Sequence, residues 1–233
     1  MTSNPDLAER VAELRRAGRT PKEIARALGL KPSQVAPLIR AIGAAAPKRE
    51  AALAGCWVSG NWAAGLTIDG HADWPGVPGT LAAESGLASV LVAREHGSSV
   101  SAVGYLVDLW CLGVKDCVGP KTMDRRKLPE FVSSFFSSYP EPPLPAPLDL
   151  AQQIVLGALG YARGLGFEPH EDFTKCAGHL GEWDGACDIT FGHDGKPMYM
   201  QGPYDDAFRI MSTLRKNVGE GNFHFTQVIS ERP

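Results

Sequence analysis

The sequence has no long apolar run, and this and related absences exclude several classes of protein. No segment reaches the roughly 18 consecutive apolar residues of a membrane-spanning helix, so no membrane partner is expected. The opening stretch MTSNPDLAER lacks the apolar core of a secretory signal. The five cysteines are odd in number and scattered, which does not fit a disulfide framework. We therefore expect free thiols and a cytoplasmic location.

Common enzyme signatures are also missing. The chain contains no phosphate-cradling glycine loop, no nucleophile elbow and no dinucleotide-binding fingerprint. Its composition, 44% hydrophobic and 21% charged, is that of an ordinary globular protein. No enzyme family is therefore indicated for residues 50–233.

The charge is unevenly distributed along the chain. Residues 1–49 contain ten Lys and Arg against four Asp and Glu, a net charge of +6, whereas residues 50–233 have a net charge of −9. A basic head on an acidic body indicates two modules with different partners, and polyanions attract only the head. We expect a first module over 1–46, a linker over 47–55 and a second module over 56–233.

The first module is predicted to contain three helices. An amphipathic pattern from Leu7 to Leu14 predicts the first of them. A second helix begins at TPKE, because Thr20 at the N-cap and Glu23 at the third helical position form a capping box. A third helix follows over residues 32–39. The sequence therefore predicts a small all-α head.

The segment EIARALGLKPSQV resembles the tri-helical helix-turn-helix of bacterial transcription regulators. The resemblance covers residues 7–42 and lies in the small Ala25 at the tight helix contact, Gly29 in the turn and Val35 in the next helix. In that family the third helix enters the major groove of duplex DNA. A single module of this kind binds weakly, so the resemblance also implies a homodimer.

The resemblance assigns six residues to the DNA interface by position. Bases would face Ser33, Gln34 and Ala36, a phosphate would meet Arg40, and the backbone would be held by Lys22 and Arg26. One departure is Pro37 inside the third helix, which we expect to kink or break it at a cost of about 3 kcal/mol. A three-helix module that binds protein, or binds nothing, is the alternative.

The second module is predicted to be an α+β domain of hairpins and helices. Strands expected to form hairpins alternate with amphipathic helices, and a proline-rich crossing over 139–147 must be extended. The expected hairpins cover 89–114 and 187–202, and the expected helices 127–139, 149–166 and 203–219. The second helix is expected to have Asp149 as its N-cap.

Asp108 is the first candidate for chemistry in this domain. We interpret LVDLWCLGV as one strand, in which alternation places Asp108 on the same face as Trp110. A carboxylate beside an aromatic ring on a strand fits a general acid or a metal ligand. An Asp that pairs with an Arg or caps a neighbouring loop is the ordinary explanation.

Other acidic residues and a histidine extend the set of candidates. Asp188 joins Asp108 as a candidate catalytic carboxylate, and His170 with Glu171 and Asp172 forms a candidate acid/base group. Converging carboxylates would also hold Mg²⁺. That acidic set is Asp108, Asp184, Asp188, Asp205 and Asp206. Helix capping accounts for the last two, and a turn accounts for Asp184.

Two further sites are hypotheses from residue type. Cys176, His179, Cys187 and His193 have zinc-ligand side chains, but a strand between the last two would hold them about 20 Å apart. The tryptophans near the glycine-rich segment 56–76 and the expected hairpin suggest a pocket for a small-molecule effector. Those tryptophans are Trp57, Trp62 and Trp110.

The leading hypothesis is a DNA-binding transcriptional regulator. Its second module would dimerise, sense a ligand, or both, and it needs no cofactor. The alternative is an enzyme whose carboxylates do acid/base or metal-assisted hydrolysis, with the basic head serving only for localisation. A third hypothesis is a protein scaffold.

Overall fold

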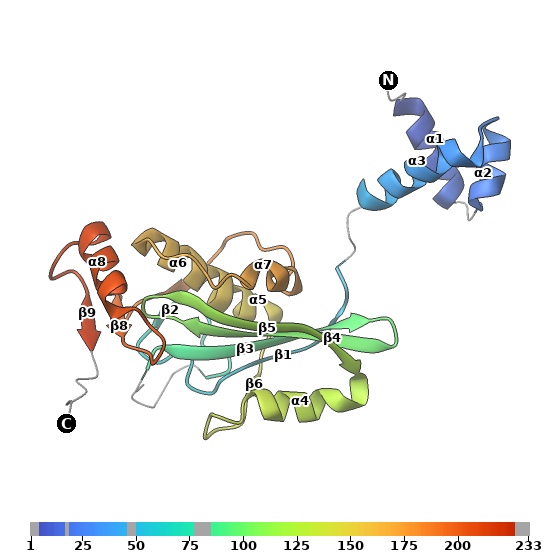
Figure 1. Ribbon diagram of the computed structural model, residues 1–233. Coiled ribbons are helices and arrows are strands. Elements are labelled where there is room, and N and C mark those ends of the chain that lie inside the picture. The colour runs from blue at the N-terminus through green and yellow to red at the C-terminus, as the bar shows by residue number, and fades with distance from the viewer. Residues whose placement is uncertain (1–4, 17–18, 46–49, 77–84, 227–233) are drawn as a thin grey trace. The chain divides into compact units, whose positions relative to one another are not determined.

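The chain divides into two compact units, Met1–Glu50 and Ala51–Pro233 (Figure 1). None of the helices in the described parts of the chain is long and apolar enough to cross a membrane. The second unit's first strand begins at Leu53, inside the range expected to be linker. The computed structural model describes residues 5–16, 19–45, 50–76 and 85–226.

The first unit contains three helices, α1 (Pro5–Arg16), α2 (Pro21–Ala27) and α3 (Pro32–Ala45). The capping box predicted for α2 is confirmed. The hydroxyl of Thr20 accepts a hydrogen bond from the Glu23 backbone at 3.4 Å, and the Glu23 carboxylate accepts one from the Thr20 backbone at 2.7 Å. Local sequence therefore begins this helix as expected.

One small core joins the three helices. Each helix contributes apolar side chains to it, and its fully enclosed members are Val11, Ile24, Ala25 and Val35. The turn between α2 and α3 contains Gly29 with φ of +66°. Glycine adopts that conformation without steric cost, which explains its place in this turn.

Pro37 does not break α3, so the expected break is absent. The helix is continuous from Pro32 to Ala45 with Pro37 inside it. The proline is exposed, so solvent is available to the Ser33 carbonyl that lacks its usual backbone donor. The helix therefore tolerates the proline on its solvent-exposed face.

The second unit is built on a five-stranded antiparallel sheet in the order β5-β4-β3-β1-β6 (Figure 1). This sheet and the helices around it confirm the α+β class. The strands are β1 (Leu53–Val58), β3 (Leu87–His96), β4 (Ser99–Asp108), β5 (Gly113–Asp124) and β6 (Leu144–Pro145).

The predicted first hairpin is confirmed with a shorter second strand. β3 and β4 pair along their full length, from Leu87 with Asp108 to His96 with Ser99. β4 ends at Asp108 and a turn over 109–112 leads into β5, so a single strand running to residue 114 is wrong. The backbone reverses there because Asp108 caps a turn, as described below.

Helices cover both faces of the sheet (Figure 1). One face packs under α5 (Leu148–Gln152), a π-helical segment (Gln153–Gly157) and α6 (Ala158–Leu165), which follow one another without a break. The other face packs against α4 (Leu128–Phe135). Alternate strand residues point to opposite faces, so the buried central strands are apolar on both.

The boundaries of the long helix match the prediction at one end only. The N-cap is Pro147 rather than Asp149, and it makes no side-chain hydrogen bond. The C-terminal end agrees, because Gly166 has φ of +94° and ends α6 in the left-handed conformation. The proline-rich crossing is extended only in part, because residues 139–141 form a bend and Leu144–Pro145 form β6, which pairs with β1.

The second predicted hairpin is wrong in its pairing. A tight turn does form, with Asp194 and Gly195 at positive φ and a bridge between His193 and Lys196. Its two flanking strands then pair with other partners. The pairs are β2 (Thr67–Ile68) with β7 (Ile189–Thr190), and β8 (Met198–Met200) with β9 (His224–Thr226).

The last helix, α8 (Ala207–Asn217), packs beside α6 near the end of the sheet. Its buried residues Met211 and Leu214 join a core cluster with Cys111, Leu165 and Tyr199. The remaining elements are short. They are the 3₁₀ turns Arg125–Lys127 and Ala177–His179 and the helix α7 (Phe173–Cys176).

Candidate functional site

Asp108 caps the turn that ends β4. Its Oδ1 accepts hydrogen bonds from the backbone N–H groups of Trp110 at 2.9 Å and Cys111 at 3.0 Å. The ordinary explanation, a carboxylate capping a loop, therefore fits. The prediction that Asp108 and Trp110 share a strand face is wrong, because the strand has already ended.

The environment of Asp108 changes its acidity. The residue is only 6% exposed, and burial raises the pKa of its carboxyl group to about 6. The two backbone N–H groups and the charge of Lys115 act in the opposite direction. Burial has the larger effect, so Asp108 titrates much closer to neutrality than an exposed aspartate.

Asp205 forms a partly buried ion pair with Lys115. The ammonium group donates to both carboxylate oxygens of Asp205, at 2.8 and 3.0 Å, and Asp205 also accepts the Gly202 backbone N–H at 2.8 Å. The neighbouring Asp206 is the N-cap of α8 and accepts from the Arg209 backbone. Capping of α8 is therefore confirmed for Asp206. Asp205 does not cap the helix but binds the Lys115 ammonium group and the Gly202 backbone N–H.

A cavity of about 510 Å³ opens beside this ion pair. It lies between the start of β5, the loop 166–170 and the N-terminal half of α8. Apolar side chains and charged groups both line it. The lining residues used below are Lys115, Phe167, His170, Asp205, Arg209 and Ile210.

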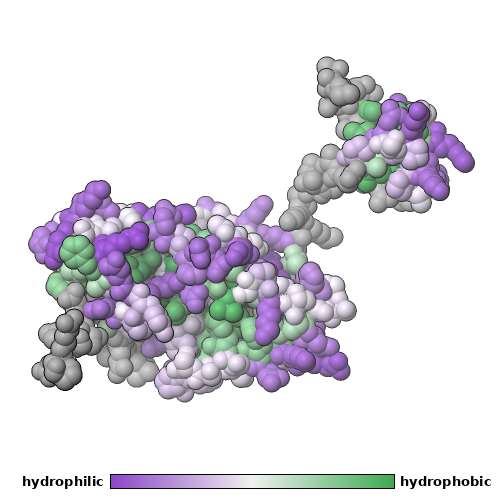
Figure 2. All heavy atoms as spheres, in the orientation of Figure 1, coloured by the Kyte–Doolittle hydropathy of each residue, from purple (hydrophilic) through white to green (hydrophobic). Residues whose placement is uncertain are grey.

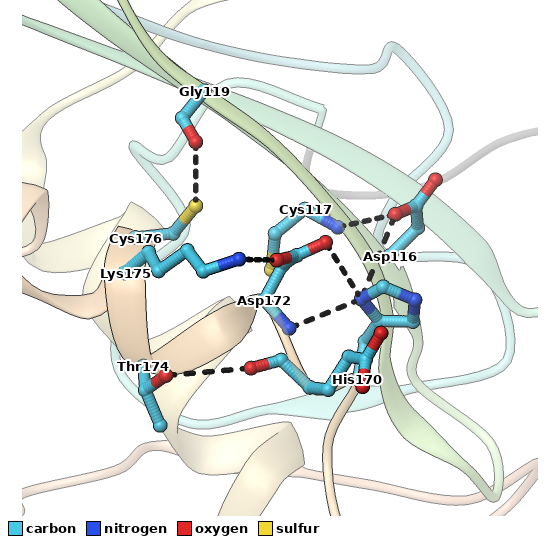
Figure 3. A network of polar contacts seen from close by, with 9 residues as sticks. Asp116, Cys117, Gly119, His170, Asp172, Thr174, Lys175 and Cys176 are labelled. Atoms are coloured by element: carbon cyan, nitrogen blue, oxygen red, sulfur yellow. Dashed lines mark hydrogen bonds and ion pairs between the residues drawn. The ribbon is translucent and has the colours of Figure 1, made fainter.

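His170 belongs to a network of acidic side chains (Figure 3). Its Nδ1 accepts the backbone N–H of Asp172 at 3.3 Å and lies 3.9 Å from the Asp116 carboxylate. Asp172 pairs with Lys175, which holds the pKa of Asp172 below its usual range. No polar contact joins the side chains of His170 and Glu171 within the described residues. His170 therefore lies beside Asp172, as predicted, and beside Asp116 in place of the predicted Glu171.

Asp188 forms a contact that the sequence did not indicate. Its Oδ2 lies 3.0 Å from Nε2 of His71, and the amide of Gln153 donates to the same oxygen at 3.2 Å. The ring of His71 stacks on Trp74 with the ring centroids 3.8 Å apart. Because 117 positions separate the two partners, no local pattern predicts this pair.

The three predicted catalytic residues do not meet in one centre. Among the described residues, no hydrogen bond or ion pair links Asp108, Asp188 and His170 to one another. Asp184 is also engaged elsewhere, because it accepts the Ala186 backbone N–H at 3.0 Å. The acidic set therefore does not form a shared Mg²⁺ site.

The predicted zinc ligands are likewise separated. No group of three or more His, Cys, Asp or Glu in the described ranges is arranged to hold a metal ion. Cys176 contacts the Gly119 carbonyl, His179 contacts Ser101 and Cys187 contacts the Ile189 carbonyl. Each candidate has its own backbone or side-chain partner instead of a common centre.

The tryptophans do not form the predicted ligand pocket. Trp62 and Trp110 are buried in the main core, where their indole N–H groups donate to the carbonyls of Pro75 and Ala64. Trp57 packs with the cluster under α4, on the opposite face of the sheet. The cavity beside Lys115 contains none of the three. Packing accounts for all of them.

The predicted DNA-contacting residues lie mostly on the surface of the first unit. Lys22, Arg26, Ser33 and Gln34 are exposed, Ala36 is half-buried, and the side chain of Arg40 lies outside the described residues. The side-chain oxygen of Gln34 accepts the Lys31 backbone N–H at 2.9 Å. Figure 2 shows hydrophilic side chains over much of the visible surface around α2.

Comparison with known proteins finds no family model, no curated protein and no solved structure that matches the chain. A functional assignment therefore depends on the geometry and charge of the two units.

Proposed function

We propose that the protein is a transcriptional regulator that binds duplex DNA through its first unit. The second unit would sense a small molecule, join two copies of the chain, or both. The connection between α2 and α3 is the observation that carries this proposal.

That connection has the features expected of a helix-turn-helix. Four residues, 28–31, separate the two helices, and Gly29 adopts the left-handed conformation. The Leu30 backbone N–H donates to the Ala25 carbonyl at 2.9 Å, which closes the end of α2. Ala25 is buried between the helices, where its small side chain allows them to approach closely. This geometry supports α3 as the helix that would enter the major groove.

Charge supports the same proposal. Residues 1–49 have a net charge of +6, and both Lys22 and Arg26 are exposed one turn apart on α2. Cations at that spacing share a helix face and suit phosphate contacts. Ser33 and Gln34 are exposed at the start of α3, as a base-reading position requires.

The test is the salt dependence of duplex binding by the full chain. Fluorescence anisotropy with a labelled duplex should show affinity that falls steeply between about 50 and 200 mM salt. The double variant Lys22→Ala/Arg26→Ala should weaken binding to every duplex and reduce the salt slope by about 2.

The matched control removes two exposed cations from the second unit, with Arg215→Ala/Lys216→Ala. It has the same change in net charge and should leave duplex affinity within about twofold. An equal loss in both double variants would mean that net charge alone drives binding. Absence of salt-dependent binding near physiological salt would overturn the proposal.

A second candidate function, an enzyme, is favoured by the pair of His71 and Asp188. A carboxylate bonded to Nε2 orients the imidazole and leaves Nδ1 for proton transfer. Turnover of a panel of chromogenic esters and phosphodiesters tests this candidate. An activity that is lost in His71→Ala and retained in His96→Ala would support it, and no turnover by the wild-type chain would exclude these two reaction classes.

A further inference from the structure

We propose that the cavity beside Lys115 binds a small carboxylic acid with an apolar body. As an effector site this rests on the proposed regulator function, but binding itself needs only the second unit. The site is built from three segments of the chain that meet at the start of β5.

The volume of the cavity and the apolar side chains that line it are those of a small-molecule site. Its volume of about 510 Å³ lies within the range of roughly 300–1,000 Å³ that is usual for such sites. Apolar side chains from all three segments line it. They are Leu112, Val114, Phe167 and Ile210. A ligand with an apolar body would cover these side chains and remove them from water.

The carboxylates of the lining already have partners. Asp205 binds Lys115 and the Gly202 backbone, and Asp206 accepts the backbone N–H of Arg209. The third, Glu168, accepts from the guanidinium of Arg163 at 3.1 Å. Lys115 and Arg163 balance the charges of Asp205 and Glu168, and the charge of Asp206 lies at the N-terminus of α8, where the helix dipole favours it. The cavity therefore does not call for a cationic ligand.

Donors of the lining, in contrast, remain available. Arg209 forms no ion pair within the described ranges of the chain, although it lines the cavity. Nδ1 of His170 accepts the backbone N–H of Asp172 (Figure 3), so the neutral ring carries its proton on Nε2. Lys115 uses two N–H groups on Asp205 and has a third. These donors suit an anion with two oxygens, which an Arg side chain can bind through two hydrogen bonds.

The charge of the lining favours a monoanion. Among the described lining residues, Arg209 is the cation without an ion-pair partner and can bind one negative charge, whereas a dianionic phosphate ester would add a second negative charge close to Asp205 and the unpaired Asp206. A lining that combines apolar side chains with the Arg209 guanidinium therefore matches an aromatic or branched aliphatic carboxylic acid.

The test is direct binding to the full chain in the absence of DNA. Calorimetric titration would use phenylacetate, indole-3-acetate and 3-methylbutanoate, each beside its neutral primary amide. At least one acid should bind with a dissociation constant below about 1 mM, and its amide should bind at least about tenfold more weakly.

Two variants of α8 connect the binding to the cavity. Arg209→Gln should weaken binding of the acid about tenfold or more, because it keeps the side chain polar and removes its charge. Arg215→Gln is the matched control, since Arg215 lies on the same helix, pairs with Glu220 and does not line the cavity. It should leave the affinity unchanged. Both side chains are exposed, so far-UV circular dichroism should be identical for the two variants.

Several results would overturn the site: no acid binds, the amides bind as well as the acids, or Arg209→Gln binds like the wild type. The effector role is tested separately by repeating the DNA anisotropy titration with the acid present. A change in duplex affinity of about threefold or more supports that role. An unchanged duplex affinity overturns the effector role alone, and loss of duplex binding in every condition overturns the regulator proposal instead.

Discussion

Asp108 combines a stabilising contact with an electrostatic cost. Its Oδ1 satisfies two backbone N–H groups at the end of β4, yet burial raises the pKa of the carboxyl group from 3.8 to about 6. Between those pH values the folded protein holds a proton that the unfolded chain has released. The free energy of unfolding therefore falls as pH rises through this window, and the cost is complete above about pH 6.

Asp108→Asn should stabilise the protein at neutral pH, because an amide oxygen keeps the turn and the buried charge is gone. We expect a gain on the order of 2 kcal/mol at about pH 7.5 and almost none at about pH 4, measured by urea unfolding. Asp108→Ala is the control. At about pH 4 it should be less stable than the wild type by about 1–3 kcal/mol, because both N–H groups lose their acceptor. A loss of stability in Asp108→Asn at pH 7.5 would show that the charge of Asp108 is compensated.

At the scale of elements, the turn between α2 and α3 depends on backbone conformation rather than on packing. A methyl group at Gly29 would meet no atom within 4 Å, so only its φ of +66° opposes a larger residue. Gly164 in α6 has equally open surroundings, but it lies in an ordinary helical position.

Gly29→Ala should therefore destabilise the first unit by about 1–2 kcal/mol, whereas Gly164→Ala should be neutral or stabilising by up to about 1 kcal/mol. Thermal unfolding followed by circular dichroism measures both. A similar effect of the two substitutions would mean that the positive φ is not the source of the cost.

The π-helical segment Gln153–Gly157 is a second feature of this scale. The two successive buried glutamines at the start of this segment contact the two ends of the connection 180–188. Gln152 donates to the carbonyls of Leu180 and Glu182, and Gln153 donates to Asp188. Such segments occur often at functional sites, and this one supports the pair of His71 and Asp188.

At the scale of the whole molecule, the two units have separate cores. The first core contains residues of the first unit only, and the three clusters of the second unit contain none of them. Loss of one core should therefore leave the other unit folded and active.

Ile24→Ala tests this separation. It removes a fully buried side chain from a core of few residues, and the cost of about 2–5 kcal/mol should unfold the first unit. Duplex binding should disappear, while binding of the carboxylic acid and the hydrogen-exchange protection of β3 and β4 remain. If exchange in β3 and β4 accelerates as well, the two units unfold together.

Local signals allowed much of the fold to be predicted. The capping box at Thr20, the end of α6 at Gly166 and the apolar stripe of α4 depend on residues a few positions apart, so the sequence contains them directly. The error in the second hairpin comes from contacts between distant residues. The turn 193–196 formed as expected, but its flanking strands found other partners.

The sequence by itself determined the helices, the first hairpin, the charge difference between the two units and the capping role of Asp206, because each follows from neighbouring residues or from composition. Only the tertiary structure decided that Asp188 meets His71 and that three segments enclose a cavity with Arg209 on its wall. These features depend on which distant segments pack together. Burial and sheet pairing select those contacts over the whole chain, and no short stretch of sequence encodes them.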